Sequence, residues 1–263
     1  MTILPLTDLN LILKPCIIKK FLYRILNRKA YFRIISISFF TLYYSGILSL
    51  FKKFRMHYFA KKLIKPGDII IDIGANMGYY TRIFSGATGK NGTVWAVEPI
   101  PLYRELIVRN IRNKSNIIIL PYALGKRESI EYMGIPGDKP YRHGLTRIMD
   151  RDNENAGYRV EVKTPEALFS NLEHIDYIKC DIEGYEANVI PGFRKIIERD
   201  KPLIQIELAP ENKQVITGFL GNMGYDPFIA GGGRLKKIDI NDAHNADILY
   251  LHKEKQSEYR ITH

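Results

Sequence analysis

Short apolar segments alternate with longer amphipathic segments through most of the chain. Segments 69–73 (IIIDI), 93–97 (TVWAV) and 117–120 (IIIL) are rich in β-branched residues, so they are predicted to be strands buried on both faces. Helices are predicted over 54–64, 79–84 and 101–113. This alternation predicts an α/β fold with a doubly wound, mostly parallel sheet whose ligands bind at the carboxyl ends of the strands.

The second half of the chain continues the pattern. Strands are predicted over 176–180, 203–208, 224–229 and 247–252, the last of them antiparallel, and helices over 185–200, broken at Pro191-Gly192, and over 211–221. Two short strands, 129–133 and 158–163, flank a polar segment, 134–157, which is expected to act as a lid over an acceptor. The polar end of the chain, 253–263, is predicted to fray.

A glycine-rich turn follows the first predicted strand. It reads G-A-N-M-G from Gly74 to Gly78, and such a turn lets the backbone approach a ligand before a helix begins. The second strand ends in Glu98, where a carboxylate can accept hydrogen bonds from both hydroxyls of a ribose. The turn lacks the third glycine of a dinucleotide-binding loop, which disfavours a nicotinamide dehydrogenase. A ribose without a pyrophosphate indicates S-adenosylmethionine.

Four stretches of the chain follow one another in a specific order: DIGANMGYYT, AVEP, IKCDIEGYE and IQIEL. They resemble the successive motifs of the FkbM-type S-adenosylmethionine-dependent methyltransferases, over roughly residues 64–208. The resemblance implies a Rossmann-like class I methyltransferase fold and methyl transfer to hydroxyl oxygens of sugars and of glycosylated or polyketide products. The residues then expected to bind the cofactor are Asp72, Gly74, Ala75, Asn76, Gly78, Tyr80, Thr81, Glu98 and Ala123.

Three carboxylates are predicted at the ends of the next two strands. Asp181 and Glu183 follow strand 176–180, and Glu207 lies at the end of strand 203–208. Because both strands neighbour the first strand in a doubly wound sheet, these acids are expected to converge beside the reactive methyl group. Strand alternation puts Lys179 on the same side as Asp181. Another reading is that Glu183 pairs with Lys179 and only organises the turn.

Two mechanisms stay open for these acids. They can hold a divalent ion such as Mg²⁺, which lowers the pKa of the acceptor hydroxyl. Alternatively they hydrogen-bond sugar hydroxyls, and one of them, or His143 of the polar segment, removes the proton. The metal-free mechanism is preferred because the acids lack a clear ligand spacing, so no metal ligand is assigned. His143 can equally be a solvated loop histidine.

The positive charge of the chain lies mainly near its N-terminus. The net charge is +11, and the basic residues are concentrated before Lys65. Segment 34–51 carries no formal charge but is only moderately apolar, and it has basic flanks. Three interpretations of this segment stay open: it forms helices that cap the catalytic core, it forms a helix that lies on an anionic membrane surface, or it spans a membrane. We therefore divide the chain into an N-terminal region, 1–53, and a methyltransferase domain, 54–263.

The two cysteines, Cys16 and Cys180, are far apart in the sequence, which argues against a disulfide framework and fits a reducing compartment. The first residues lack the basic start of a secretory signal. A cytoplasmic location is therefore expected, at the inner face of a membrane if the N-terminal region binds lipid.

The favoured function is O-methyl transfer to a hydroxyl of a sugar, glycan or glycolipid. A nucleic-acid methyltransferase gains support from the basic charge, but the N/D-P-P-Y and Pro-Cys motifs of such enzymes are missing, so no nucleic-acid partner is expected. A non-catalytic, membrane-associated S-adenosylmethionine-binding module is the remaining alternative, although such a module would have no need of Asp72, Glu98 and Asp181.

Overall fold

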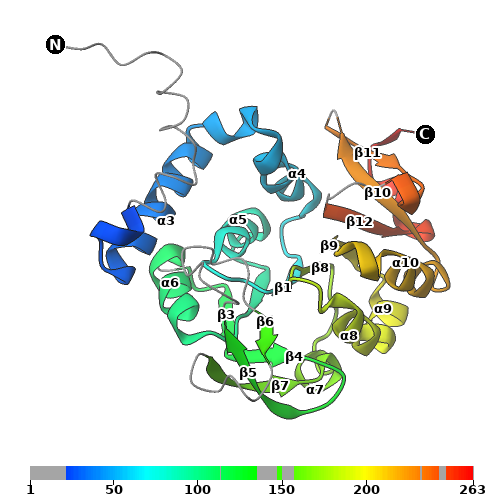
Figure 1. The fold of residues 1–263 in the computed structure, drawn as a ribbon. Helices are drawn as coiled ribbons and strands as arrows, with labels where there is room; N and C mark the ends of the chain where they lie inside the picture. Colours follow the sequence, from blue (N-terminus) through cyan, green and yellow to red (C-terminus); the bar gives the residue numbers. More distant parts are fainter. Residues whose placement is uncertain are drawn as a thin grey trace.

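The apolar segments form the strands of one large sheet (Figure 1). The computed structural model describes residues 22–112, 114–134, 147–149, 157–231, 233–242 and 247–262, with the backbone alone at 147–149 and 242. Within these ranges nine strands pair in the order β13-β11-β10-β12-β9-β8-β1-β2-β3. They are β1 Ile69–Ile73, β2 Thr93–Val97, β3 Ile117–Leu120, β8 Tyr177–Cys180, β9 Leu203–Glu207, β10 Tyr225–Gly231, β11 Arg234–Lys237, β12 Asp247–His252 and β13 Ile261–Thr262.

The sheet is doubly wound, as the sequence predicts. β1 lies between β2 and β8 and is parallel to both, and β9 continues the parallel order on the far side of β8. β12 inserts between β9 and β10 and runs antiparallel to each. The carboxyl ends of β1, β2 and β8 therefore meet at one edge, where a ligand is expected.

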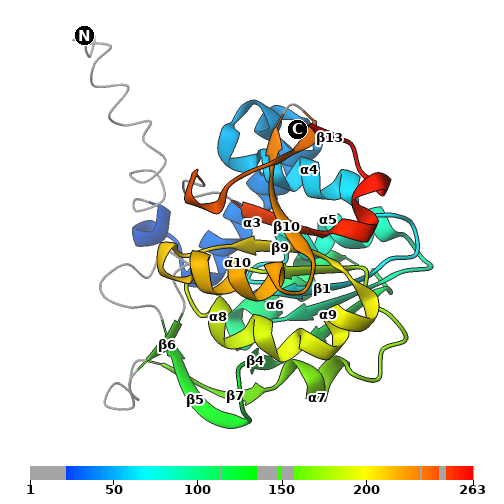
Figure 2. The same ribbon diagram turned by 90° about the vertical axis from the view of Figure 1, so that its right-hand side faces the viewer.

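Helices cover both faces of this sheet (Figure 2). α4, α5 and α6 cover one face, which is lined by Ile70, Val94 and Ala96. α7 to α10 cover the other, lined by Ile71 and Ile178. The bounds are α3 Arg28–Tyr44, α4 Arg55–Leu63, α5 Tyr79–Thr88, α6 Pro101–Ile111, α7 Pro165–Phe169, α8 Glu186–Val189, α9 Arg194–Asp200 and α10 Lys213–Gly221, with 3-10 turns η1 Ile47–Leu50, η2 Lys52–Phe54, η4 Ile190–Phe193, η5 Pro210–Asn212, η6 Ile240–Asp242 and η7 Lys253–Glu258.

Proline and threonine shape two of these helices. The predicted helix 185–200 is interrupted at Pro191, where η4 separates α8 from α9. Proline lacks the N–H that a continuous helix requires. Thr164 caps α7, since its side chain accepts a hydrogen bond from the N–H of Ala167 at 3.2 Å.

A second, four-stranded sheet stands beside the main one, in the order β4-β7-β5-β6. Its strands are β4 Tyr122–Leu124, β5 Ser129–Gly134, β6 Arg147–Met149 and β7 Tyr158–Lys163. The predicted strands 129–133 and 158–163 are thus confirmed as an antiparallel pair. Residues 122–124, just after β3, form β4 because they pair in parallel with β7. Most of the predicted lid, including His143, lies outside the described residues.

The end of the chain is not frayed as predicted. Ile261 pairs with Leu235, so β13 extends the sheet beside β11. Ile261 and Tyr259 also pack against the apolar core, and Lys65 forms an ion pair with Glu258. Apolar contacts and strand pairing therefore order a segment that its polar composition predicted to be loose.

The N-terminal helices pack directly on the main domain. α3 begins after Asn27, whose side chain accepts a hydrogen bond from the N–H of Ala30. Phe39 and Phe40 share a core with Phe84, and the Phe39 ring stacks on Tyr79 with the ring centroids 3.9 Å apart. One face of α3 is thereby buried against the helices that cover the sheet.

Candidate functional site

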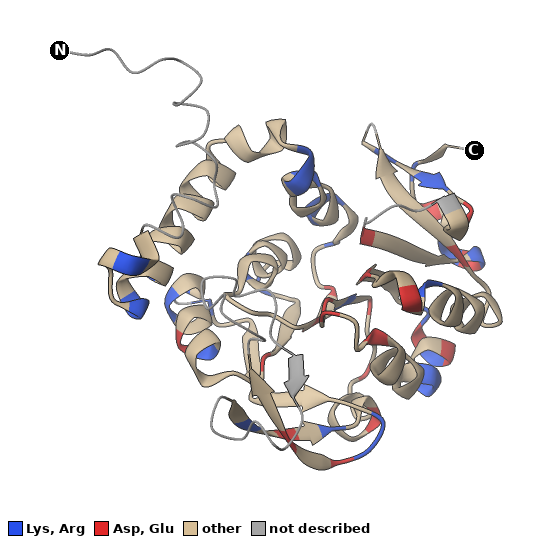
Figure 3. Ribbon diagram, viewed as in Figure 1, with Lys and Arg blue, Asp and Glu red and all other residues tan. Residues whose placement is uncertain are grey.

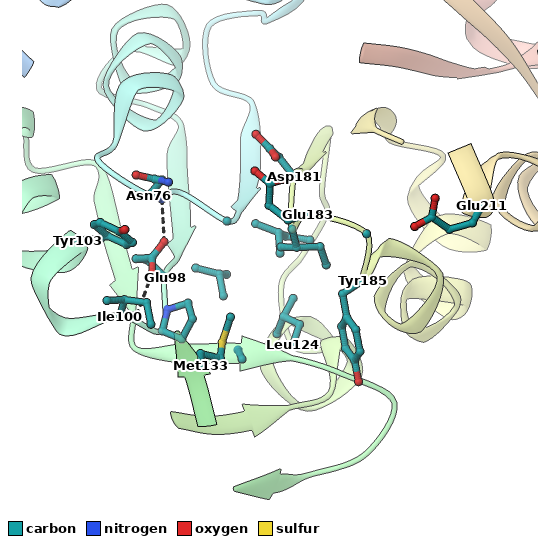
Figure 4. A pocket seen from close by; sticks show the side chains of 17 residues that line it. Asn76, Glu98, Ile100, Tyr103, Leu124, Met133, Asp181, Glu183, Tyr185 and Glu211 are labelled. Atoms are coloured by element: carbon teal, nitrogen blue, oxygen red, sulfur yellow. Dashed lines mark hydrogen bonds between the residues drawn. The ribbon is translucent and has the colours of Figure 1, made fainter. Parts of the chain in front are cut away.

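A cavity of about 460 Å³ opens at the carboxyl ends of the central strands, a volume typical of small-molecule sites. Its walls come from the turn after β1, the end of β2, the second sheet and the turn after β8 (Figure 4). We call residues 74–78 the glycine turn and residues 181–185 the acidic turn. Figure 4 shows Asn76 and Glu98 on one side of the cavity and Asp181 and Glu183 on another.

The glycine turn has a backbone that requires glycine. Gly74 and Gly78 both have φ of +76°, and Asn76 has φ of +50°, a region that most side chains avoid. A Cβ on Gly74 would lie 2.0 Å from the carbonyl oxygen of Asp181. The two turns therefore touch through their backbones, and the cavity floor can close only because residue 74 has no side chain.

Glu98 fixes the glycine turn from below. Its Oε2 accepts the N–H of Asn76 and its Oε1 accepts the N–H of Ile100, both at 2.8 Å. Burial raises the pKa of Glu98 to about 7, although these two hydrogen bonds oppose the shift. Each carboxylate oxygen has a second lone pair, and Glu98 lines the cavity.

Asp72 and Thr81, predicted to bind the cofactor, do not line the cavity. Both are fully buried, and the Thr81 hydroxyl donates to Asp72 Oδ2 at 2.6 Å. This bond ties β1 to α5 next to the glycine turn. The cause is strand alternation, which turns Asp72 toward α5.

The other predicted cofactor residues fall into two groups, those that line the cavity and those that do not. Gly74, Asn76, Glu98 and Ala123 line the cavity, whereas Ala75, Gly78 and Tyr80 do not. Ala75 is buried against Ala96 and Ile107. Gly78 is the N-cap of α5, and a Cβ there would lie 3.2 Å from the side chain of Ile107.

Lys179 lies at the base of the acidic turn. Its Nζ donates to Asp181 Oδ2 at 3.0 Å and lies 3.9 Å from Asp72 Oδ1. Burial alone would lower the pKa of Lys179, but the carboxylates of Asp181 and Asp72 raise it above its usual value. Lys179 thus pairs with Asp181, as strand alternation predicted, and with Asp72 rather than with Glu183. It does not reach the cavity surface.

The negative charge of Asp181 helps to raise the pKa of Glu183 and of Glu207. Burial, followed by the charge of Asp181, raises the pKa of Glu183 to about 7. Asp181 is also the main cause that raises the pKa of Glu207. Of the three acids predicted to converge, Asp181 and Glu183 line the cavity, whereas Glu207 does not. Glu183 has φ of +54°, which marks the acidic turn as strained.

Two residues that hold the acidic turn were missed in the sequence. Glu186 is fully buried and accepts the N–H of Gly184 at 2.9 Å. Asn212, on η5, donates to the carbonyl of Gly184 at 2.8 Å and to Glu186 Oε2 at 3.0 Å. An acid at the first position of a short helix is a weak sequence signal for such a role, and Asn212 carries none.

His57, on α4, was also missed. Its ring stacks on Tyr80 with centroids 4.2 Å apart, and Lys179 Nζ lies 4.7 Å from the centre of the same Tyr80 ring. Burial, and then Lys179, lower the pKa of His57 to about 4, so the imidazole is neutral at pH 7. α4 therefore places a neutral histidine against Tyr80, close to Lys179.

Metal ligands were not assigned from the sequence. Among the residues that the structure describes, no group of three or more His, Cys, Asp or Glu side chains is arranged to hold a metal ion. Cys180, the described cysteine, is free and buried.

Comparisons with solved structures find several that are similar to this chain. Methyltransferase FkbM from Methylobacillus flagellatus matches with a TM-score of 0.50 and 16% identity over 72% of this chain and 44% of that chain. An Aeropyrum pernix fibrillarin with natively bound S-adenosyl-L-methionine matches with a TM-score of 0.42 and 16% identity, over 71% of this chain and 67% of that chain. A SAM-dependent O-methyltransferase from Thermotoga maritima matches with a TM-score of 0.43 and 14% identity, over 80% of this chain and 66% of that chain. The chain spans less than half the length of the first of these proteins.

A comparison with curated protein sequences finds no match. The family model described as the methyltransferase FkbM domain matches residues 72–227. This range contains the glycine turn, Glu98, the acidic turn and Asn212, and it covers more than half of the chain. The Rossmann-like class I methyltransferase fold and the family resemblance predicted from the motifs are confirmed. The chain belongs to the FkbM methyltransferase domain family.

Proposed function

We propose that the protein is an S-adenosylmethionine-dependent O-methyltransferase whose acceptor is a hydroxyl of a sugar, glycan or glycolipid. Family membership supports methyl transfer. The observation that carries the proposal is the joint placement of Glu98 and of the Asp181-Glu183 pair on the walls of one cavity. One wall suits a ribose, and the other suits a hydroxyl that must lose its proton.

The residues present fit the cofactor. Gly74 and Asn76 of the glycine turn line the cavity, so a ligand could lie close to the backbone of this turn. Glu98 would hold the ribose hydroxyls through the lone pairs that Asn76 and Ile100 leave unused. Ala123, a small residue on β4, would border the base. When bound, S-adenosylmethionine supplies an electrophilic methyl group.

The acidic turn would serve the acceptor. A hydroxyl that attacks a methyl group must give up its proton, and a carboxylate with a pKa near 7 is well matched to that task. Glu183 would therefore act as general base. Asp181, held by Lys179, would orient the hydroxyl.

A sugar suits this wall better than a nucleic acid. Asp181, Glu183 and Glu211 all line the cavity, and carboxylates accept hydrogen bonds from hydroxyls but repel phosphates. The chain's positive charge lies elsewhere, in the residues before Lys65. A nucleic-acid substrate is therefore disfavoured at the cavity itself.

Transfer of labelled methyl groups from S-adenosylmethionine to methyl glycosides, a glycolipid extract and ribosomal RNA tests the proposal. We expect label in a carbohydrate arm. Glu183→Gln should lower turnover by about 10²–10⁴-fold and leave the affinity for S-adenosylhomocysteine unchanged. Glu173→Gln, an exposed acid outside the cavity, is the control. Label in RNA alone would overturn the acceptor class, and cofactor binding without label in any arm would favour a non-catalytic module.

Exhaustive chelation tests the preferred mechanism. If Glu183 removes the proton, activity should survive chelation, because no divalent ion is then needed to lower the pKa of the hydroxyl. Loss of activity that added Mg²⁺ restores would favour the metal-assisted mechanism.

A further inference from the structure

The net charge of the chain resides almost wholly in one part of the structure. Residues 22–67 contain ten Lys and Arg and no Asp or Glu, whereas residues 68–263 contain 26 Lys and Arg against 27 Asp and Glu. Figure 3 shows basic residues near the start of α3 and again where η2 leads into α4, with uncharged residues between them. Residues 68–263 are therefore nearly neutral, and residues 22–67, with α3 and α4, are strongly basic.

The same helices expose large apolar side chains. Tyr31, Phe32, Phe39 and Tyr43 bury one face of α3, and the opposite face points outward. The exposed set continues through η1 up to the basic residues at 52–55. We call this set the N-terminal apolar face: Ile34, Ile37, Tyr44, Ile47, Leu50 and Phe51, which are between 41% and 75% exposed.

Basic side chains border this face. Lys52, Lys53 and Arg55 are exposed and form no ion pair with an acidic side chain of the described residues. Lys52 and Lys53 follow Phe51 directly in the sequence, so exposed basic groups adjoin one end of the apolar face. Exposed apolar groups beside unpaired cations are typical of helices that lie in the headgroup region of an anionic bilayer.

We propose that the N-terminal apolar face and Lys52, Lys53 and Arg55 form a docking surface for an anionic lipid membrane. The apolar side chains enter the boundary between headgroups and acyl chains, and the basic side chains contact lipid phosphates. No helix in the described ranges is both long and apolar enough to cross a bilayer, so the surface lies on the membrane. This inference does not depend on the reaction that the protein catalyses.

A second copy of this chain and a nucleic acid both fit this surface less well than a membrane does. A second copy would bring two such surfaces together, each part of a segment with ten positive charges and no negative ones, and they would repel. A nucleic acid would satisfy the cations but leave Leu50 and Phe51, 75% and 56% exposed, without an apolar partner. An anionic bilayer satisfies both kinds of group.

Flotation of the full chain with lipid vesicles tests the proposal. We expect binding to phosphatidylcholine vesicles that contain about a third phosphatidylglycerol, and little binding to phosphatidylcholine alone. Binding should weaken between about 0.1 M and about 0.5 M salt, because salt screens the cations. Equal binding to both vesicle types, or none to either, would overturn the proposal.

Matched variants locate the surface. Leu50→Glu with Phe51→Glu should weaken vesicle binding by about 10-fold or more, and Lys52→Glu with Lys53→Glu should abolish the preference for anionic lipid. Val108→Glu with Val215→Glu adds the same charge at two positions, each 60% exposed, on other helices, and should bind like the wild type. An equal loss in this control, or unchanged binding in the other two variants, refutes the assignment.

Two further measurements identify a different occupant. Light scattering after size exclusion would contradict the proposal if it showed a dimer that Leu50→Glu with Phe51→Glu dissolves. A competing oligonucleotide that strips the protein from vesicles, and binds it more tightly than they do, would contradict it as well.

Discussion

The two turns that form the cavity are built in different ways. The glycine turn is held mainly by backbone groups: the N–H groups of Gly74 and Ala75 both donate to the carbonyl of Val97 at 3.1 Å, and Glu98 adds one side-chain hydrogen bond, from the N–H of Asn76. The acidic turn is held by side chains, since Glu186 and Asn212 bind its backbone and Lys179 binds Asp181. Backbone support fixes a shape that accommodates a ligand, whereas side-chain support also sets the charge state of the acids. Substitutions should therefore affect the two turns differently.

The largest effect is expected at the support of the acidic turn. Lys179→Met would leave Asp72, which is fully buried, without its compensating cation. We expect a loss of about 3–5 kcal/mol of unfolding free energy, measured by chemical denaturation. Lys195→Met is the control, because Lys195 forms an exposed ion pair with Glu166 that contributes at most about 1 kcal/mol. Equal losses in both variants would show that the buried pair has no special weight.

Gly74→Ala tests where the two turns meet. The new Cβ would need the space of the Asp181 carbonyl oxygen, 2.0 Å away, and φ of +76° is strained for alanine. We expect a loss of about 2–4 kcal/mol together with loss of cofactor binding, measured by denaturation and calorimetry. Gly86→Ala, in α5 with open space around it, should stabilise by about 0.5–1 kcal/mol. A harmless Gly74→Ala would contradict the close contact of the turns.

Glu98→Gln separates cofactor binding from catalysis. Glutamine offers one acceptor oxygen, but the N–H groups of Asn76 and Ile100 require two. We expect the affinity for S-adenosylhomocysteine to fall by about 10–100-fold, measured by calorimetry. Glu105→Gln, an exposed acid on α6, should bind normally. Normal binding by Glu98→Gln would remove the ribose role of this residue.

The smallest effect concerns pH and the acidic turn alone. The pKa of Glu183 is raised to about 7, so its carboxylate is mostly protonated at pH 6 and becomes a base as pH rises. We expect turnover at saturating cofactor to increase about fivefold from pH 6 to pH 7 and to level off above about pH 8. A flat profile would exclude Glu183 as the base, and a profile that shifts in Glu207→Gln would implicate Glu207.

Much of the sheet, and the residues Gly74 and Glu98 of the cavity wall, could be predicted from local sequence. β1, β2 and β3 match their predicted bounds because short β-branched runs have few other stable arrangements. Gly74 and Glu98 were identified because a glycine turn and an acid at a strand end keep their meaning without distant contacts.

The remainder depends on contacts between distant segments. Asp72 was assigned to the cofactor, but its direction is set by packing against α5. β13 has only two residues and forms because β11 lies beside it. His57 reaches Tyr80, and Asn212 reaches Glu186, only when α4 and η5 dock on the core. Such residues carry no periodic or spacing signal.

The separation of charge between the N-terminal helices and the rest of the chain gives the protein an electric dipole. With ten of the eleven net positive charges in residues 22–67, the molecule experiences a torque in the field of any negatively charged interface. That torque begins at about the Debye length, roughly 8 Å at physiological ionic strength. The molecule therefore turns its basic end toward the interface before any side chain touches it, and the orientation of approach is selected by long-range forces.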